Sequence, residues 1–100
     1  MSRYAVYTTP RALQESKDLP GHMRQRVKRA VRALADEPRP SNSKDLEWPN
    51  SDHELRRLKM DKWRVVYAIT EADNAVDVLA VRRRPPYDYG DLADLLREWF

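Results

Sequence analysis

The sequence has no cysteine and only two histidines among its 100 residues. Without cysteine, the chain can form neither disulfide bonds nor thiolate metal sites. His22 and His53 are far apart in sequence and lack the spacing of paired metal ligands. We therefore expect no metal site and no cofactor.

Long hydrophobic runs are also missing, and no segment resembles a signal peptide. We therefore expect a soluble protein that does not associate with membranes. A cytoplasmic location fits the lack of cysteine, because the cytoplasm is reducing. The length predicts a single domain spanning residues 1–100, and a hydrophobic content of 41% is enough for a small core.

The net charge is only +3, but the charges are unevenly distributed along the chain. Residues 19–35 include five basic side chains and no acidic one, whereas acidic side chains predominate in residues 41–54 and 88–98. Positive charge returns between Arg56 and Arg84. A basic body with an acidic C-terminal segment suits a polyanionic partner, above all nucleic acid. The basic residues of 19–35 fit a solvated helix surface equally well.

The first half of the chain predicts a strand and two helices. Residues 4–8 have the alternation of a strand. Thr9 suits an N-cap and Pro10 the first helical position, so a short helix should extend to about residue 18. Apolar residues at helical spacing predict a second helix that faces a core: Met23, Val27, Ala30, Val31 and Leu34. The two helices should form an antiparallel hairpin.

The second half predicts a sheet and a last helix. Residues 39–52 are rich in Pro, Ser, Asn and Asp and should form a loop. Strands are expected near 54–60, 63–70 and 75–82, followed by a helix over 91–100. The sequence therefore predicts an α+β fold in the order β-α-α-β-β-β-α. In it, the helix hairpin packs on one face of a small, mainly antiparallel sheet and basic side chains occupy the other face.

Basic side chains recur at alternating positions within these strands. Because residues two apart in a strand point to the same face, Arg57 and Lys59 should project together. Arg64 lies at the start of the next strand, where an unpaired buried guanidinium would be costly. It should therefore either face a phosphate or pair with an acid such as Asp77. A cationic cluster on a sheet face suits phosphate binding, because guanidinium matches phosphate geometry.

The order of elements and two segments resemble the RelE/ParE superfamily of toxins from bacterial toxin–antitoxin systems. The most specific match is the central hairpin, Leu55–Met60 followed by Trp63–Tyr67 (Trp-Arg-Val-Val-Tyr), and the resemblance covers nearly the whole chain. It implies a cognate antitoxin as partner. For the RelE-like branch, which we favour, it also implies metal-independent mRNA cleavage on translating ribosomes, with the ribosome and mRNA as further partners.

The resemblance also implies roles for individual residues. Six would be catalytic: Arg57, Lys59, Arg64, Arg84, Tyr87 and Tyr89. Four more would bind nucleic acid: Arg56, Lys62, Arg82 and Arg83. Arg64 would contact the scissile phosphate, and Arg84 follows from it by ungapped counting, with Arg83 as the alternative. Only one of the two tyrosines is needed. The chain departs from the family at Leu55, where some members have lysine, and at Pro85-Pro86, which alters the path to the tyrosines.

The residues themselves leave several alternatives open. The 2′-hydroxyl of a ribonucleotide can attack the adjacent phosphate, but the sequence offers no obvious general base. Lys59 or a tyrosine could serve only if its pKa were lowered by neighbouring cations. Arg57 and Lys59 could instead belong to a solvated sheet face, and residues 82–84 to a positively charged strand end. At least one tyrosine could simply pack under the last helix.

Two other functions compete with mRNA cleavage. A ParE-type toxin has the same fold, inhibits DNA gyrase and lacks the catalytic cluster. A non-catalytic module that binds RNA or protein is the third possibility. In either toxin, an antitoxin could cover the cationic face with acidic side chains. It could also displace the amphipathic C-terminal segment, which contains Leu92, Leu95, Leu96 and Trp99.

Overall fold

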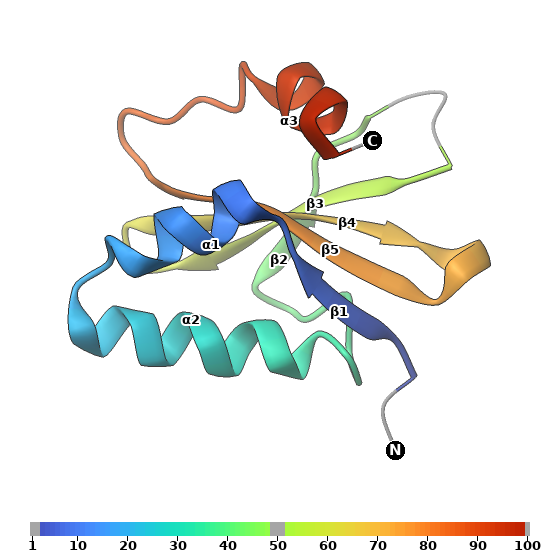
Figure 1. Cartoon of the computed structure of the whole chain (residues 1–100), viewed down its shortest axis with the longest axis horizontal. Helices are drawn as coiled ribbons and strands as arrows, with labels where there is room; N and C mark the ends of the chain where they lie inside the picture. Colours follow the sequence, from blue (N-terminus) through green and yellow to red (C-terminus); the bar gives the residue numbers. More distant parts are fainter. Residues whose placement is uncertain (1–2, 49–51, 100) are drawn as a thin grey trace.

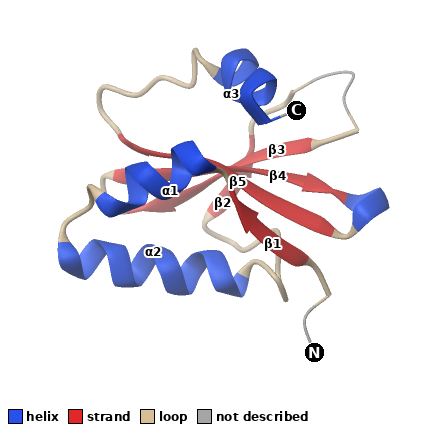
Figure 2. Cartoon of the chain, in the orientation of Figure 1, coloured by secondary structure: helices blue, strands red, loops and turns tan. Residues whose placement is uncertain are grey.

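The computed structural model describes residues 3–48 and 52–99. The elements follow in the order β1 (Ala5–Thr8), α1 (Pro10–Lys17), α2 (Gly21–Ala33), β2 (Ser43–Asp45), β3 (Glu54–Met60), β4 (Trp63–Thr70), a 3-10 turn (Glu71–Asp73), β5 (Ala75–Arg83) and α3 (Leu92–Trp99). The strands form one sheet in the order β1-β5-β4-β3-β2, in which only the β1–β5 pair is parallel (Figure 2). The predicted α+β fold is confirmed. None of the helices in the described ranges is long and apolar enough to cross a membrane.

The helix hairpin forms as its local sequence predicts. Thr9 caps α1 by accepting a hydrogen bond from the backbone N–H of Ala12 at 3.2 Å, and Pro10 occupies the first helical position. Ala12 of α1 and Met23 and Val27 of α2 are buried in one apolar cluster, and α2 lies on the side of the sheet opposite α3 (Figure 1). The strand residues beneath them include Val65, Tyr67 and Ile69, as the alternation in β4 requires.

The structure corrects the expectation that the second face is left to basic side chains. The third helix packs there, and its buried residues Leu92, Leu95 and Leu96 form a separate apolar cluster with the sheet. The strand residues in this cluster are Leu55, Val66, Ala68, Leu79 and Ala80. The amphipathic stripe of α3 needs an apolar surface to cover, and the sheet provides one on only part of this face. The molecule therefore has two cores, one on each side of the sheet (Figure 1).

A second correction concerns residues 39–52, which were expected to form a loop. Within them, Ser43–Asp45 form β2, an edge strand that pairs antiparallel with β3. The strand has three polar residues and therefore no hydrophobic alternation that could indicate it. Its pairing places Lys44 opposite Arg57.

An irregularity in β5 determines which way its last residues point. Val66 of β4 pairs with Ala80, but the next residue, Tyr67, pairs with Val78, so Leu79 is an extra residue and forms a β-bulge. Both Leu79 and Ala80 pack in the cluster beneath α3. Beyond the bulge the alternation resumes, with Val81 in the core beneath the helix hairpin.

Candidate functional site

Basic side chains occupy the part of the α3 face that lies towards the β3–β4 turn. Lys59 on β3 is directly opposite Arg64 on β4, and Arg64 is directly opposite Arg82 on β5. In the adjacent row, Arg57 on β3 is directly opposite Lys44 on β2. Directly opposed residues project from the same face of a sheet. The register therefore confirms that Arg57, Lys59 and Arg64 share a face, and it adds Lys44 and Arg82 to them.

Arg64 keeps an unneutralised charge in this arrangement. Its Nη1 donates hydrogen bonds of 2.9 Å to the backbone carbonyl oxygens of Asp61 and Trp63, and no carboxylate in the described ranges pairs with it. The suggested ion pair with Asp77 is wrong, because Asp77 pairs with Ala68, towards the opposite end of the two strands. The two carbonyls hold the half-buried guanidinium, which remains available for an anion.

A hollow of about 310 Å³ lies beside the cationic rows. Its lining residues come from three parts of the chain: Lys44, Asp45, Leu46, Glu47, Arg57, Arg84 and Tyr89. The guanidinium carbon of Arg84 is 5.4 Å from the ring centroid of Tyr89, within the range of a cation–π contact. Arg57, Arg84 and Tyr89, which the sequence analysis had selected from distant segments, therefore meet here. The residues of β2 and its flank were missed, because nothing in the sequence indicated that strand.

The two candidate tyrosines have different environments. Tyr87 donates its hydroxyl to Asp91 Oδ1 at 2.7 Å. Burial, reinforced by the hydrogen bond to Asp91 and its negative charge, raises the pKa of Tyr87 well above the usual value. Tyr87 therefore stays protonated and cannot accept a proton near neutral pH. Tyr89 instead lines the hollow, with its ring 4.8 Å from that of Tyr87.

The four residues predicted to bind nucleic acid are placed differently from one another. Arg56 lies on the face beneath the helix hairpin and pairs with Glu54 at 2.7 Å, and Arg82 pairs with Asp91 at 2.8 Å and also with Glu15. Two others are exposed: Lys62, in the β3–β4 turn, and Arg83, which lies opposite Trp63. A nucleic-acid-binding role for any of the four remains a prediction.

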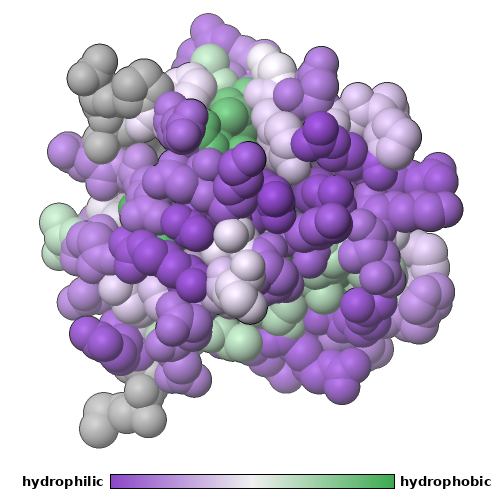
Figure 3. Space-filling view, turned by 180° about the vertical axis from the view of Figure 1, so that it is seen from behind, coloured by the Kyte–Doolittle hydropathy of each residue, from purple (hydrophilic) through white to green (hydrophobic). Residues whose placement is uncertain are grey.

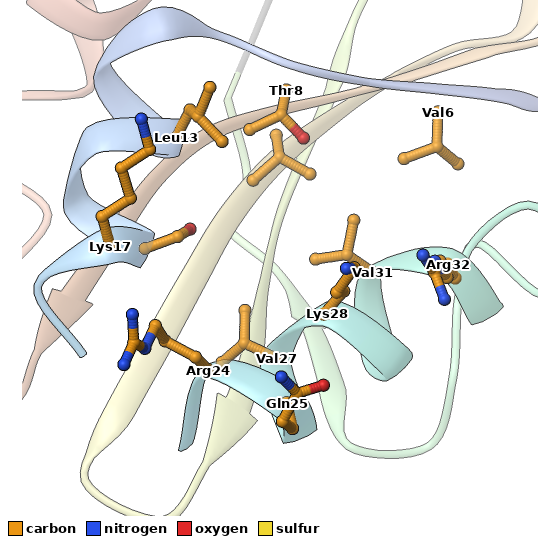
Figure 4. Close-up of a pocket in the computed structure, with 12 residues that line it drawn as sticks. Val6, Thr8, Leu13, Lys17, Arg24, Gln25, Val27, Lys28, Val31 and Arg32 are labelled. Atoms are coloured by element: carbon orange, nitrogen blue, oxygen red, sulfur yellow. The ribbon is translucent and has the colours of Figure 1, made fainter. Parts of the chain in front are cut away.

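A larger groove of about 480 Å³ lies on the opposite side of the sheet, between β1, α1 and α2 (Figure 4). Its floor is apolar and includes Val27 and Val31. Leu13 lines it and is 50% exposed, which makes it one of only two large hydrophobic side chains exposed in the described residues. Four basic side chains also line the groove: Lys17, Arg24, Lys28 and Arg32. By contrast, the molecule seen from behind presents a mostly hydrophilic surface (Figure 3).

Comparison with known proteins places this chain in a family. Residues 6–85 match the family described as the ParE toxin of a type II toxin–antitoxin system, parDE. No curated protein sequence matches the chain significantly.

Several solved structures have the same fold. The archaeal RelE–RelB complex from Pyrococcus horikoshii OT3 contains a chain with 23% identity and a TM-score of 0.76, over 85% of this chain and 99% of that one. A chain of the RelBE2 toxin–antitoxin complex of Mycobacterium tuberculosis has 23% identity and a TM-score of 0.69, and the match covers 82% of this chain and 99% of that one. A chain of the intact E. coli RelBE complex has 25% identity and a TM-score of 0.63, and the match covers 80% of this chain and 95% of that one. The chain thus belongs to the ParE toxin family, within the RelE/ParE superfamily, and is a toxin of a type II toxin–antitoxin system.

Proposed function

We propose that this toxin is a metal-independent endoribonuclease that cleaves mRNA on translating ribosomes in the cytoplasm. One observation carries the proposal: Arg57, Arg84 and Tyr89 line a single hollow beside the cationic row of Lys59 and Arg64. A hollow bordered by cations and an aromatic ring suits a nucleotide, because the ring can stack on a base while guanidinium groups bind phosphate.

The chemistry uses charge and alignment. The 2′-hydroxyl oxygen attacks the adjacent phosphorus, the bond from phosphorus to the 5′-oxygen breaks, and a cyclic phosphate and a free 5′-hydroxyl result. One group must accept the 2′-hydroxyl proton and another must supply a proton to the leaving oxygen. The negative charge that develops on the phosphoryl oxygens is stabilised by four cations: Arg57, Lys59, Arg64 and Arg84. The ribosome holds the RNA in a reactive geometry, which supplies much of the rate.

Glu47 is a candidate proton acceptor that the sequence analysis did not consider. Its exposed side chain lies at the hollow, and its backbone N–H donates to Asp45 Oδ1 at 2.6 Å. In the described part of the chain the Glu47 carboxylate has no ion pair. Glu47→Gln should slow cleavage on the order of 100-fold. Asp36→Asn, which removes an exposed carboxylate from another surface, is the control. A wild-type cleavage rate in Glu47→Gln would assign the base elsewhere.

Arg64 provides the direct test of nuclease function. Arg64→Ala should reduce mRNA cleavage in a translation reaction, read by primer extension, by on the order of 100-fold or more. Arg64→Lys should not restore it, because lysine lacks the planar fork. Arg97→Ala, which removes an exposed arginine from α3, should cleave like the wild type. Full cleavage by Arg64→Ala would refute the assignment.

Inhibition of DNA gyrase is the second candidate, and the ParE description of the matching family favours it. The assays that separate the two functions use the same purified protein. If the wild type and Arg64→Ala both block DNA supercoiling and neither cleaves mRNA, the toxin belongs to the gyrase-inhibiting branch. A folded protein that does neither is a non-catalytic binding module.

We further propose that a cognate antitoxin binds the groove between β1, α1 and α2. Several of the structural neighbours are complexes with antitoxins, which makes such a partner expected here. The apolar floor and basic lining of this groove complement an amphipathic helix with acidic side chains. Covering of the cationic face and displacement of α3, the two modes expected from the sequence, remain separate predictions.

A further inference from the structure

Arg82 projects from the cationic row but is surrounded by carboxylates. Its Nε donates to Glu15 of α1, and its Nη1 donates to Asp91 Oδ2 at 2.8 Å. Its side chain is 20% exposed, and its guanidinium carbon is 5.1 Å from the ring centroid of Tyr87. Two charge-assisted hydrogen bonds and a stacked ring fix its position. A phosphate would have to displace both carboxylates in order to bind it.

Glu15 connects this arrangement to the edge of the sheet. The pairing of β1 with β5 ends at Thr8 and Val78, so β5 lacks a strand partner on that side beyond this point. Glu15 Oε1 accepts the backbone N–H of Val81 at 3.0 Å, in place of a strand carbonyl. Its other oxygen accepts from Arg82. The Glu15 carboxylate thus satisfies a backbone N–H at the edge of β5 and orients the side chain of Arg82.

Asp91 performs a similar task at the start of α3. One of its oxygens accepts from Arg82 and the other from the Tyr87 hydroxyl. Burial alone would raise the pKa of Asp91, but the hydrogen bonds from Tyr87 and Arg82 outweigh it and lower that pKa. Asp91 therefore remains charged, and residues 82, 87 and 91 form a closed set of contacts.

This set leads directly to the hollow. The rings of Tyr87 and Tyr89 meet edge to face, with 4.8 Å between centroids and 67° between planes, and the Tyr89 ring contacts Arg84. The contacts therefore run without a break from Arg82 through the two tyrosines to Arg84. Only the last two residues of this series line the hollow.

We propose that Arg82 is a positioning residue, which binds Glu15 and Asp91 and stacks on Tyr87 in order to hold Tyr89 and Arg84 at the hollow. This role rests on the proposed function, since it serves RNA cleavage. It differs from the direct contact with nucleic acid that the sequence predicts for Arg82.

The two roles give opposite kinetic results for Arg82→Gln in cleavage on programmed ribosomes. A positioning role lowers kcat, roughly 10- to 100-fold as expected for a displaced reacting group, and leaves KM and its salt dependence unchanged. A direct phosphate contact instead raises KM. It also lowers the slope of log KM against log salt concentration by about one, and this result would overturn the proposal. The control is Arg97→Gln, which removes an arginine paired with Asp94 on the exposed side of α3 and should change neither constant.

Glu15→Gln provides a second variant if Arg82→Gln does not fold. The amide oxygen of the new glutamine can still accept a hydrogen bond from the Val81 N–H, but the negative charge beside Arg82 is lost. The substitution should lower kcat by itself, and a wild-type kcat in Glu15→Gln would overturn the proposal. Where Arg82→Gln does fold, the double variant should be no slower than Arg82→Gln alone. Additive losses in the double variant would overturn the proposal, because they would show that Glu15 and Arg82 act separately.

An absorbance titration of the tyrosines checks the contacts without using RNA. The ionisation of Tyr87 is obtained as the difference between the wild type and Tyr87→Phe, because burial raises the pKa of Tyr67 as well. This difference should appear at a higher pH than the ionisation of an ordinary tyrosine, and at a lower pH when it is measured in the Asp91→Asn background. A Tyr87 that ionises like an ordinary tyrosine would overturn the positioning role, even for an active nuclease. A wild type in which Tyr87 ionises late but which cleaves no mRNA would overturn the proposed function, and the catalytic purpose of Arg82 with it.

Discussion

Lys59 on β3 lies directly opposite Arg64 on β4, with both side chains on the same face of the sheet. Like charges that face each other across two strands repel and destabilise the pair. Arg82, the next residue in the row, has its charge balanced by Glu15 and Asp91, whereas no carboxylate in the described ranges pairs with Lys59 or Arg64. The fold therefore keeps an unfavourable pair of charges on the proposed RNA-binding face.

Neutralising Lys59 should increase stability and reduce activity. We expect Lys59→Gln to raise the free energy of unfolding, measured in urea, by about 0.2–1 kcal/mol, because the cross-strand repulsion is removed. Cleavage of mRNA by the same variant should fall, since a cation near the phosphate is lost. Lys28→Gln, on the exposed surface of α2, is the control and should leave the free energy nearly unchanged. A destabilised Lys59→Gln would contradict the repulsion.

The stability of the fold should fall at alkaline pH because of Tyr87. Its raised pKa means that the folded protein retains a proton that the unfolded chain releases above about pH 10. Stability is therefore lost as the pH rises above this value. The contribution of Tyr87 to the slope approaches one proton, about 1.4 kcal/mol per pH unit, and the buried Tyr67, whose pKa is also raised, adds to it. Urea titrations between pH 8 and pH 11 should show a shallower slope for Tyr87→Phe. Val27→Ala, which removes buried apolar atoms and no ionisable group, should keep the wild-type slope.

Two valines of α2 should differ in their contribution to the core. Val27 is 3% exposed, whereas Val31 is only partly buried at the groove. Val27→Ala should destabilise the protein by about 1–3 kcal/mol through the cavity that it leaves. Val31→Ala should cost less, because its cavity is open to solvent. Equal losses in urea denaturation would mean that the helix is seated deeper than the structure shows.

The groove on the helix hairpin should govern antitoxin affinity separately from catalysis. Leu13→Asp places a negative charge at the exposed apolar position of the groove, where it opposes an acidic partner. We expect antitoxin binding, measured by calorimetry, to weaken at least 10-fold while mRNA cleavage stays at the wild-type rate. Tyr7→Ser, at the other exposed large hydrophobic residue, tests whether any loss of apolar surface has this effect. Unchanged binding by Leu13→Asp would favour covering of the arginines or displacement of α3.

The sequence was most informative where local patterns determine structure. The alternation of apolar and basic residues in 54–70 placed Arg57, Lys59 and Arg64 on one face, and the register confirms this. The cap at Thr9 and the stripe of α2 were equally readable, because capping and helical periodicity act within one or two turns.

The features that were missed depend on partners distant in sequence. An edge strand of three polar residues, such as Ser43–Asp45, becomes a strand only by pairing with β3. The stripe of α3 predicted a helix but could not specify which face of the sheet it covers. Arg82 could not be assigned its partner, because Glu15 is 67 residues away. Tyr87 and Tyr89 became distinguishable only through Asp91, which accepts a hydrogen bond from one of them.

The bulge at Leu79 makes chain length, as well as residue type, a determinant of this surface. Counting in steps of two from Val76, which faces the helix hairpin, would place Arg82 and Arg84 under that hairpin. The extra residue reverses the parity, so that Arg82 joins Arg64. A single insertion or deletion elsewhere in β5 would turn these arginines to the wrong side even if every basic residue were kept. Among relatives of this toxin, an arginine at the expected position is therefore informative only together with the strand length that precedes it.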